Sequence, residues 1–335
     1  MALLVAWSAA SALCAQGEVM PQVVFTPVVI ELPPEPVEPA PTEVGTMPGY
    51  PRRIDGWLEV QIELSRRGFS CGPIDGIGGA QTGAALRAFQ MEAGLDPNGR
   101  LDTATLAALQ LTAPAFFVRM LSAGDLASLQ PVSETWLGKS QQSALAHETA
   151  LESIAERFHA HPNLVRQLNP EVDWTAVTPD TPITVPAIER VFRNIKAARL
   201  AIRLADRVLR AHDANGGVIA HFPVSIARRV DKRPVGELKV TVIAPDPNYT
   251  FDPAVFPESD EGRKLGRRLI LPPGPNNPVG VAWIGLNLPG YGIHGTPIPE
   301  HVGRTESHGC FRLANWDARS LIELAWVGLP VVVEP

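Results

Sequence analysis

Near the C-terminus, a single cysteine lies among three of the chain's eight histidines: Cys310 with His294, His301 and His308. A thiol reacts as its thiolate, and imidazole is the side chain best matched to remove the thiol proton near neutral pH. Gly309, just before the cysteine, lets the backbone approach a reacting carbonyl, and successive N–H groups at such a turn can form an oxyanion hole. These residue types predict nucleophilic catalysis by Cys310, with His294 as its base.

Strands are the elements that would position these two side chains. The apolar run 281–286 shortly precedes His294, and Cys310 follows His294 by 16 residues (310 − 294). This spacing predicts a base at the end of one strand and a nucleophile at the end of the next, facing each other across a cleft. His301 is expected on the loop surface between them.

The rest of the C-terminal region also predicts a mostly β structure. Leu200, Ile202 and Leu204 alternate with polar or small residues, which is the period of a strand. Further predicted elements are strands over 208–211, 218–226, 238–243 and 330–333, a hairpin turn at 213–217 and a helix over 316–325. His212 and His221 fall on strands and are expected to be structural. The segment 245–277, rich in proline, glycine and charge, predicts a long irregular insert that forms one wall of the substrate cleft.

Cys310 has two other interpretations. A lone cysteine is often a small buried apolar residue. Cysteine and histidine together can bind zinc, but zinc ligands usually recur at short spacings, and no second thiol lies near Cys310. The three cysteines, Cys14, Cys71 and Cys310, are odd in number and far apart, which argues against a disulfide framework and favours a free reactive thiol. We expect no metal and no cofactor.

The motif as a whole resembles a known family. His294-Gly295-Thr296, a loop, and then the run from Ser307 through Cys310 to Leu313 (SHGCFRL) are similar to the motif of the YkuD-type (ErfK/YbiS-like) L,D-transpeptidases, bacterial cell-wall enzymes with a cysteine nucleophile. The similarity extends over 191–333. It implies a closed, mostly β catalytic domain (a β-sandwich or barrel) over 191–335, with the cysteine motif at one end of the sheet.

The resemblance also implies a role for each motif residue. Cys310 would attack the peptide bond after the third residue of a donor stem tetrapeptide, and His294 would take the thiol proton and later protonate the leaving amine. The carbonyl of Gly295 would orient the imidazole, and the N–H groups of Gly309 and Cys310 would hold the oxyanion. The remaining motif residues would line the site or bind substrate: His308, Ser307, Thr296 and Arg312. The Arg312 guanidinium suits a substrate carboxylate, such as that of diaminopimelate, or a structural salt bridge.

The acyl acceptor is left open by the motif. An amine from a neighbouring stem would give a 3→3 cross-link, a free D-amino acid would give exchange, a lysine of an envelope protein would give anchoring, and water would give carboxypeptidase activity. Carbapenems are the expected inhibitors. The alternatives are an L,D-carboxypeptidase or cysteine hydrolase of wall peptides, and a non-catalytic protein that binds peptidoglycan.

Residues 52–112 predict a compact helical domain. Apolar positions over 60–68 and 82–94 have helical spacing and end at glycines, and Asp102 is a predicted N-cap of a third helix. The pattern from Ile74-Asp75-Gly76 to Thr105 resembles the three-helix peptidoglycan-binding domain; a generic helical spacer is the alternative. Cys71 is expected to be structural.

Two further segments precede the catalytic region. Residues 113–146 predict a connector. Residues 147–188 contain two helical patterns, in which Pro162 begins the second, followed by a predicted closing strand at 181–186. This segment resembles LysM, a βααβ module that binds the glycan strands of peptidoglycan; a helical hairpin without a ligand is the alternative.

The N-terminal segments predict export. Residues 1–15 are apolar and rich in small residues, too short for a stable transmembrane helix, and typical of a signal peptide. Cys14 also permits lipidation as a minority interpretation. Residues 16–51 are a proline-rich linker, because proline fixes φ and lacks an N–H donor. We therefore expect the periplasm or cell envelope as the location.

Composition limits the remaining function classes. The chain has 335 residues, a net charge of −6 and 19% charged residues, so it lacks the basic character expected of a nucleic-acid-binding protein. Its length suits several small domains, and the elements above predict a multidomain α+β protein. Oligomeric state and domain arrangement are not predicted by the sequence.

Overall fold

The computed structural model describes residues 48–188, 195–254, 256, 258–305 and 309–335. The predicted signal peptide, Cys14 and most of the linker lie outside the described residues, as do Ser307 and His308 of the motif. Among the residues that are described, none of the helices is long and apolar enough to cross a membrane.

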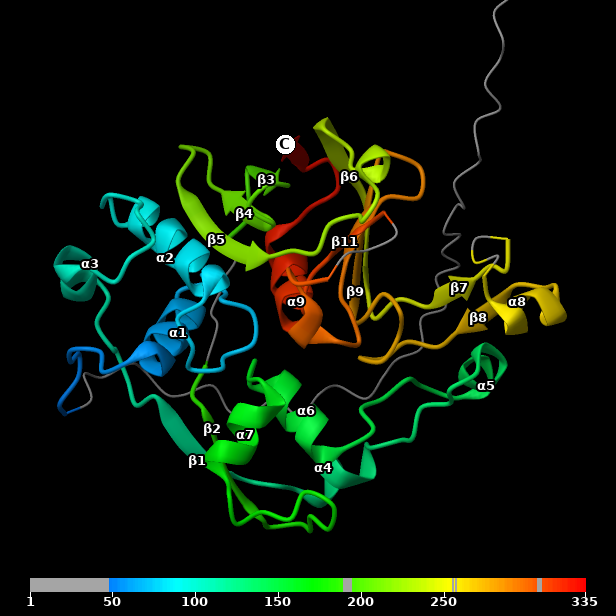
Figure 1. Ribbon diagram of the computed structural model, residues 1–335, viewed down its shortest axis with the longest axis horizontal. Coiled ribbons are helices and arrows are strands. Elements are labelled where there is room, and N and C mark those ends of the chain that lie inside the picture. The colour runs from blue at the N-terminus through cyan, green and yellow to red at the C-terminus, as the bar shows by residue number, and fades with distance from the viewer. Residues whose placement is uncertain (1–47, 189–194, 255, 257, 306–308) are drawn as a thin grey trace, which may run out of the picture.

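The C-terminal region forms one curled eight-stranded sheet (Figure 1). In sheet order its strands are β11 (Phe311–Arg312), β10 (Gly292–His294), β9 (Ala282–Leu286), β6 (Gly236–Pro245), β12 (Pro330–Glu334), β3 (Arg199–Arg203), β4 (Val208–His212) and β5 (Val218–Pro223). Beyond β5, Ser225 exchanges two backbone hydrogen bonds with Arg312 of β11, at 2.9 and 3.0 Å. The two edges of the sheet therefore meet, as the expected closed β fold requires.

Helix α9 (Asn315–Leu324) packs against β6, β9 and β10 of this sheet (Figure 1). Leu321 and Leu324 on the helix and Ile284 and Ile293 on the strands are buried in one apolar core. The predicted C-terminal helix and final strand are confirmed. The predicted strand 218–226 ends earlier, at Pro223, where the chain leaves β4 and turns toward β11.

The segment 245–277 is more ordered than its composition predicts. It contains β7 (Tyr249–Phe251), α8 (Asp260–Leu265) and β8 (Leu269–Leu271), and β7 pairs with β8 in antiparallel register. The expectation of an irregular insert is wrong because these short strands are stabilised by a partner distant in sequence. Trp136 of α5 (Trp136–Gln141) stacks on Phe251 at 4.3 Å, and Glu261 accepts hydrogen bonds from the first N–H groups of α5.

The N-terminal described region contains α1 (Trp57–Arg66), α2 (Ala80–Glu92) and α3 (Thr103–Ala108). The predicted N-cap is confirmed, because the Asp102 carboxylate accepts the N–H of Thr105 at 2.8 Å. Cys71 is buried, in line with a structural role. Gly68 and Ser70, after α1, exchange backbone hydrogen bonds with His221 of β5, so this helical region is joined to the sheet edge.

The segment predicted as LysM-like has its helices, α6 (Ala150–Arg157) and α7 (Pro162–Leu168), and its closing strand β2 (Pro182–Pro186). The expected first strand within 147–188 is wrong. The strand that pairs with β2 is β1 (Phe116–Met120), which lies in the predicted connector. Helix α4 (Ala123–Ala127), α5 and their loops separate β1 from α6, and this long separation hides the pairing from local sequence patterns.

The accessory regions pack against one another and against the catalytic sheet. Apolar residues of α1, α2, α6, α7 and β2 belong to one continuous core. Ser70 donates a hydrogen bond to Asp317 of α9 at 2.8 Å, and His159, after α6, stacks on Trp316 at 5.2 Å. The helical region, the β1–β2 unit and the catalytic domain therefore form one body rather than separate beads on a string.

A buried histidine at this junction, His221, predicts that the stability of the protein depends on pH. His221 is fully buried, neither of its ring nitrogens has a hydrogen-bond partner within the described residues, and Arg210 lies opposite it in the sheet. Burial, and secondarily the Arg210 charge, lower the pKa of His221 to about 3. The fold thus favours the neutral ring, whereas the unfolded chain binds a proton as pH falls below 6.5. The free energy of unfolding is therefore unaffected by His221 above pH 6.5 and decreases as pH falls from 6.5 toward 3.

We expect His221→Leu to lose less stability on acidification than wild type. Between pH 6.5 and 4, protonation of His221 in the unfolded chain accounts for about 3 kcal/mol of lost stability, at 1.36 kcal/mol per pH unit. Urea unfolding at pH 7 and pH 4 measures the difference. Equal losses for both proteins would contradict the assignment.

Candidate active site

The register of three strands sets the geometry of the site. His294 of β10 lies opposite Arg312 of β11 in a parallel pair, and opposite Trp283 of β9 in an antiparallel pair. Cys310 directly precedes β11, and the Arg312 charge lowers the pKa values of both His294 and Cys310, so the three side chains lie near one another. The predicted nucleophile, base and arginine are thus brought together at the closed edge of the sheet.

His294 is buried, and its contacts determine its tautomer. Its Nδ1 lies 2.6 Å from the carbonyl oxygen of Gly295. A carbonyl can only accept, so Nδ1 carries the proton and Nε2 carries the lone pair of a base. The ring stacks on Trp283 at 5.6 Å. Burial lowers the pKa of His294 to about 4; the Gly295 bond opposes this shift and the Arg312 charge adds to it.

Cys310 is half-buried, and its thiol is held by backbone groups. Sγ lies 3.4 Å from the carbonyl oxygen of Gly290. Burial raises the pKa of Cys310 to about 11, and a hydrogen bond from Gly292 and the Arg312 charge only partly oppose this. At pH 7 the resting site therefore holds a neutral thiol and a neutral imidazole, and the thiol needs a base at the moment of attack.

Two tyrosines lie within electrostatic reach of the thiol. Burial and, after it, the charge of the Cys310 thiolate raise the pKa values of Tyr249 and Tyr291. Tyr291 donates to the Lys232 carbonyl at 3.0 Å. Tyr249 belongs to β7, so the inserted β7–β8 segment reaches the surroundings of the nucleophile.

Asn315 is a site residue that the sequence analysis missed. It is buried at the start of α9, and its Oδ1 accepts the N–H groups of Thr296 at 3.0 Å and Val281 at 3.3 Å. Its Nδ2 donates to the carboxylate of Glu156 on α6 at 3.0 Å and to the Pro275 carbonyl at 3.1 Å. Its position five residues after Cys310 (315 − 310) was the only sequence signal.

The glycines beside Asn315 leave room for this bridge. A Cβ on Gly295 would lie 2.2 Å from Oδ1, and a Cβ on Gly280, whose φ is +61°, would lie 2.0 Å from it. Because Gly295 also supplies the carbonyl bound to His294, Asn315 holds the backbone that orients the base.

We expect Asn315→Ala to destabilise the protein by about 2–5 kcal/mol, because two buried N–H groups lose their acceptor. Acylation of Cys310 should slow as well, because the His294–Thr296 backbone is no longer fixed. Asn315→Asp keeps an acceptor for both N–H groups but turns a second oxygen toward the Glu156 carboxylate, so it should also be destabilised, while acylation should fall less than in Asn315→Ala. Thermal unfolding and acylation rates measure the two effects, and equal acylation rates in Asn315→Ala and wild type would contradict the positioning role.

The other predicted site residues lie as follows. Gly309 is buried beside Cys310. Thr296 is 4% exposed and its hydroxyl accepts the Ile298 N–H at 3.4 Å, which is a structural position. His301 is exposed, as predicted, at the end of a short 3-10 helix (Pro299–His301). Within the described ranges no group of three or more His, Cys, Asp or Glu side chains is arranged to hold a metal.

A cysteine and an imidazole of defined tautomer beside each other at the edge of a closed β sheet are the groups that a cysteine acyl-transfer site requires. A family model for the L,D-transpeptidase catalytic domain (YkuD) matches residues 197–333, and one for a peptidoglycan binding domain matches 53–109. The chain belongs to the L,D-transpeptidase family, and it is an enzyme that acts on peptidoglycan. The predicted catalytic and peptidoglycan-binding domain types are thereby confirmed.

Individual relatives support this membership. A Bacillus licheniformis protein named L,D-transpeptidase YkuD is 26% identical over 185 residues, covering 55% of this chain and 93% of that protein. A Fuscovulum blasticum reading frame in the ATP synthase subunits region, also named as an L,D-transpeptidase, is 32% identical over 142 residues, covering 42% of this chain and 72% of its own length. A solved Enterococcus faecium catalytic domain acylated by ertapenem aligns with 42% of this chain and 99% of its own at 18% identity and a TM-score of 0.31, too loose a likeness to transfer residue roles.

Proposed function

We propose that Cys310 is the nucleophile and His294 the general base of this L,D-transpeptidase, acting on the stem tetrapeptide of peptidoglycan. The observation that carries the proposal is the bond from His294 Nδ1–H to the Gly295 carbonyl, because it leaves Nε2 free to act as a base. His294 pairs with Arg312, whose charge also acts on Cys310. The enzyme then forms and resolves a thioester.

In the first half-reaction, Nε2 of His294 takes the thiol proton as Sγ of Cys310 attacks the carbonyl of the third stem residue. The N–H groups of Gly309 and Cys310 stabilise the oxyanion. When the tetrahedral intermediate collapses, the C–N bond breaks, the imidazolium gives its proton to the departing D-alanine amine, and a thioester remains. In the second half-reaction, His294 takes a proton from the acceptor amine, which attacks the thioester and restores the thiol.

Arg312 is proposed to bind a substrate carboxylate. It is half-buried near Cys310, and its backbone N–H and C=O are both hydrogen-bonded to Ser225. Burial lowers the pKa of the guanidinium, and the Cys310 thiolate raises it. Ser307 and His308 are proposed to line the same site. Carbapenems are proposed to acylate Cys310, because they present a strained acyl group to the same thiol.

The unit of β1, α6, α7 and β2 is proposed to be a LysM-like module that binds glycan strands. Its support is the β1–β2 pair together with the helix pair α6–α7, although α4 and α5 are inserted between β1 and α6. Because the polymer lies outside the cytoplasmic membrane, export to the periplasm or cell envelope is part of the proposal.

The test uses the full chain with purified disaccharide-tetrapeptide, with and without a free D-amino acid, and mass spectrometry of the products. Release of D-alanine with 3→3 dimers or D-amino-acid exchange is the expected result. Tripeptide alone would mean that water is the acceptor and that the enzyme is an L,D-carboxypeptidase. No product, together with retention on insoluble peptidoglycan, would support a binding protein without catalysis. An excess of a lysine-containing peptide in a parallel reaction tests protein anchoring.

A further inference from the structure

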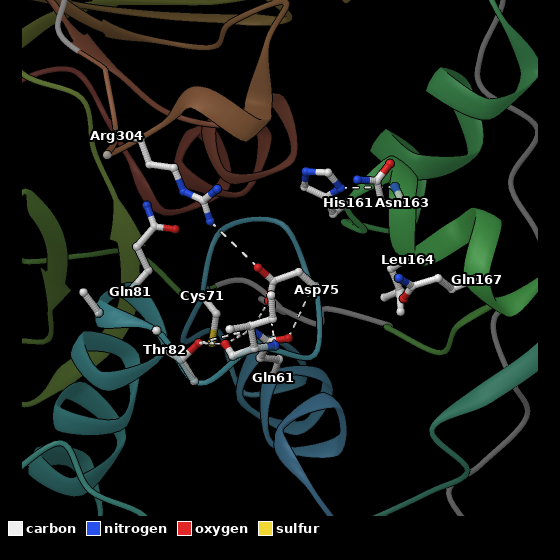
Figure 2. Close-up of a pocket in the computed structure, with 14 residues that line it drawn as sticks. Gln61, Cys71, Asp75, Gln81, Thr82, His161, Asn163, Leu164, Gln167 and Arg304 are labelled. Carbon is white, nitrogen blue, oxygen red and sulfur yellow. Dashed lines mark hydrogen bonds and ion pairs between the residues drawn. The ribbon is translucent and has the colours of Figure 1, made fainter.

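A pocket of about 450 Å³ lies where three parts of the chain meet (Figure 2). Its walls come from Gln61 of α1, from the segment 71–82 (the loop before α2 and the first residues of α2), from the start of α7, and from Gly303 and Arg304 before Cys310. Its volume falls in the range of small-molecule sites. Cys310 is not among the lining residues, so this pocket is separate from the thiol, although Arg304 precedes the thiol by only 6 residues (310 − 304).

Residues 302–305, which precede Cys310 and are here called the catalytic loop, are joined to the helical region at one side of this pocket. Gln81 of α2 donates to the Val302 carbonyl at 2.7 Å, and Ser225 accepts the Gly303 N–H at 2.9 Å. The Gln81 side-chain amide lies between Gly303 and Gly72, both of which have positive φ. A Cβ on Gly303 would lie 2.4 Å from Gln81 Nε2, and a Cβ on Gly72 would lie 2.9 Å from Gln81 Oε1, so neither position has room for a side chain. The side chain of Gln81 therefore fixes this wall.

The remaining walls are also preformed. Ile74 exchanges backbone hydrogen bonds of 2.8 Å with His159 and His161, which anchors the start of α7 to the 71–82 loop. The Gln61 amide is fully used inside the loop, where it bonds Asp75, Ile77 and Thr82. A ligand would thus meet a rigid site, which reduces the ordering cost of binding.

Several polar groups around the pocket remain available to a ligand. Within the described part of the chain, the Gln167 amide makes no hydrogen bond, and the Asn163 Nδ2 and His161 Nε2 atoms have none either. Figure 2 shows His161 and Asn163 together at the start of α7, across the pocket from Gln81. Exposed Ile77 and the buried edge of Leu164 add apolar surface.

The charge of the pocket favours an uncharged ligand. Its single carboxylate, Asp75, faces its single guanidinium, Arg304, at 3.8 Å (Figure 2). The lining therefore has no net formal charge when His161 is neutral. Amide donors and acceptors beside a small apolar surface match the acetamido and hydroxyl groups and the C–H faces of an N-acetylated sugar better than an anionic peptide.

We propose that this junction pocket binds an N-acetylated amino-sugar unit of the glycan strand. The proposal rests on the proposed function, since that strand is the backbone of the substrate polymer. The bound sugar would contact the accessory helices and the catalytic loop together, which aligns the strand so that its stem peptide reaches Cys310.

The probe is the β-1,4-linked tetramer of N-acetylglucosamine, titrated into the full chain by calorimetry. An Asn163→Ala/Gln167→Ala double variant removes two exposed amides and should weaken binding about tenfold. Within the described residues, the bond that Asn163 Oδ1 accepts from Arg166 at 3.2 Å is the only side-chain hydrogen bond lost. Glu171→Ala probes the second pocket, which lies in the α7–β2 loop of the LysM-like unit. Asn215→Ala is the matched control, because it removes an exposed amide in the β4–β5 turn, away from both pockets, and should leave binding unchanged. Thermal unfolding confirms that each variant is folded.

Two outcomes overturn the proposal: no binding to wild type, or a loss of binding in Glu171→Ala with none in the double variant. Carbapenem acylation of Cys310 is measured on the same proteins, so that failure of the pocket proposal can be told apart from failure of the proposed catalytic function. Normal acylation without sugar binding rejects the pocket assignment and the glycan binding proposed for the LysM-like unit, but leaves the proposed nucleophile standing. Absence of acylation in wild type rejects the proposed nucleophile.

Discussion

A Cys310→Ala variant is expected to form no covalent adduct with a carbapenem and to lose transpeptidase activity by at least about 10³-fold. The physical reason is direct: the thioester forms on Sγ, and alanine offers no nucleophile. Intact-protein mass spectrometry detects the adduct, and the tetrapeptide assay measures the rate. A single added acyl mass on wild type alone is the expected result.

Cys71→Ala is the matched control because Cys71 is the other free thiol of the described residues. Cys71 is 2% exposed and packs in the core of the helical region, so it should not be acylated and its loss should leave the adduct intact. An adduct that persists in Cys310→Ala, or disappears in Cys71→Ala, would place the reactive thiol elsewhere.

A His294→Ala variant is expected to slow acylation at pH 7 by about 10²–10⁴-fold. Burial raises the pKa of Cys310 to about 11, so without a base only about one thiol in 10⁴ is ionised at pH 7. The neutral imidazole supplies the missing proton acceptor, and its Nδ1–H bond to Gly295 aims the free Nε2.

The pH dependence of acylation distinguishes this role from a structural one. Because burial lowers the pKa of His294 to about 4, the ring is unprotonated, and so active as a base, above that pH. Wild-type acylation should therefore lose activity only as pH falls through about 4, and change little from pH 5 to 7. In His294→Ala the rate should instead rise about tenfold per pH unit toward pH 11, as hydroxide replaces the base.

His301→Ala is the control for the histidine variant, since His301 is exposed and, among the described residues, only its backbone is hydrogen-bonded. Its profile should match wild type. A wild-type acid limb centred near pH 6.5, or the same profile in His294→Ala and wild type, would contradict the assignment of His294 as the buried base.

The packing of the accessory regions bears on how such an enzyme acts on an insoluble polymer. The core that joins α1, α2, α6 and α7 is continuous, and the catalytic loop is bonded to α2 through Gln81. A surface that binds the wall thus has a defined distance and orientation relative to Cys310, which a flexible tether would not provide.

Local chemistry was predictable from the sequence alone. Cys310 and His294 stand at the ends of neighbouring strands, so their types and spacing were enough to predict a nucleophile and a base. The resemblance of the motif to the L,D-transpeptidases added the carbonyl of Gly295 as the group that orients the imidazole. The cap at Asp102 and the helix α9 follow from short-range rules, and the sequence predicted these as well.

Only the tertiary structure decided the features that depend on residues distant in the chain. Strand β2 pairs with β1 across 116–186, the insert at 245–277 orders because β7 meets β8 and Trp136, and Asn315 reaches Thr296 and Glu156 at once. The raised pKa of Cys310 and the lowered pKa of His294 likewise come from burial. Burial and long-range pairing are properties of the packed molecule, because each needs partners that no local pattern encodes.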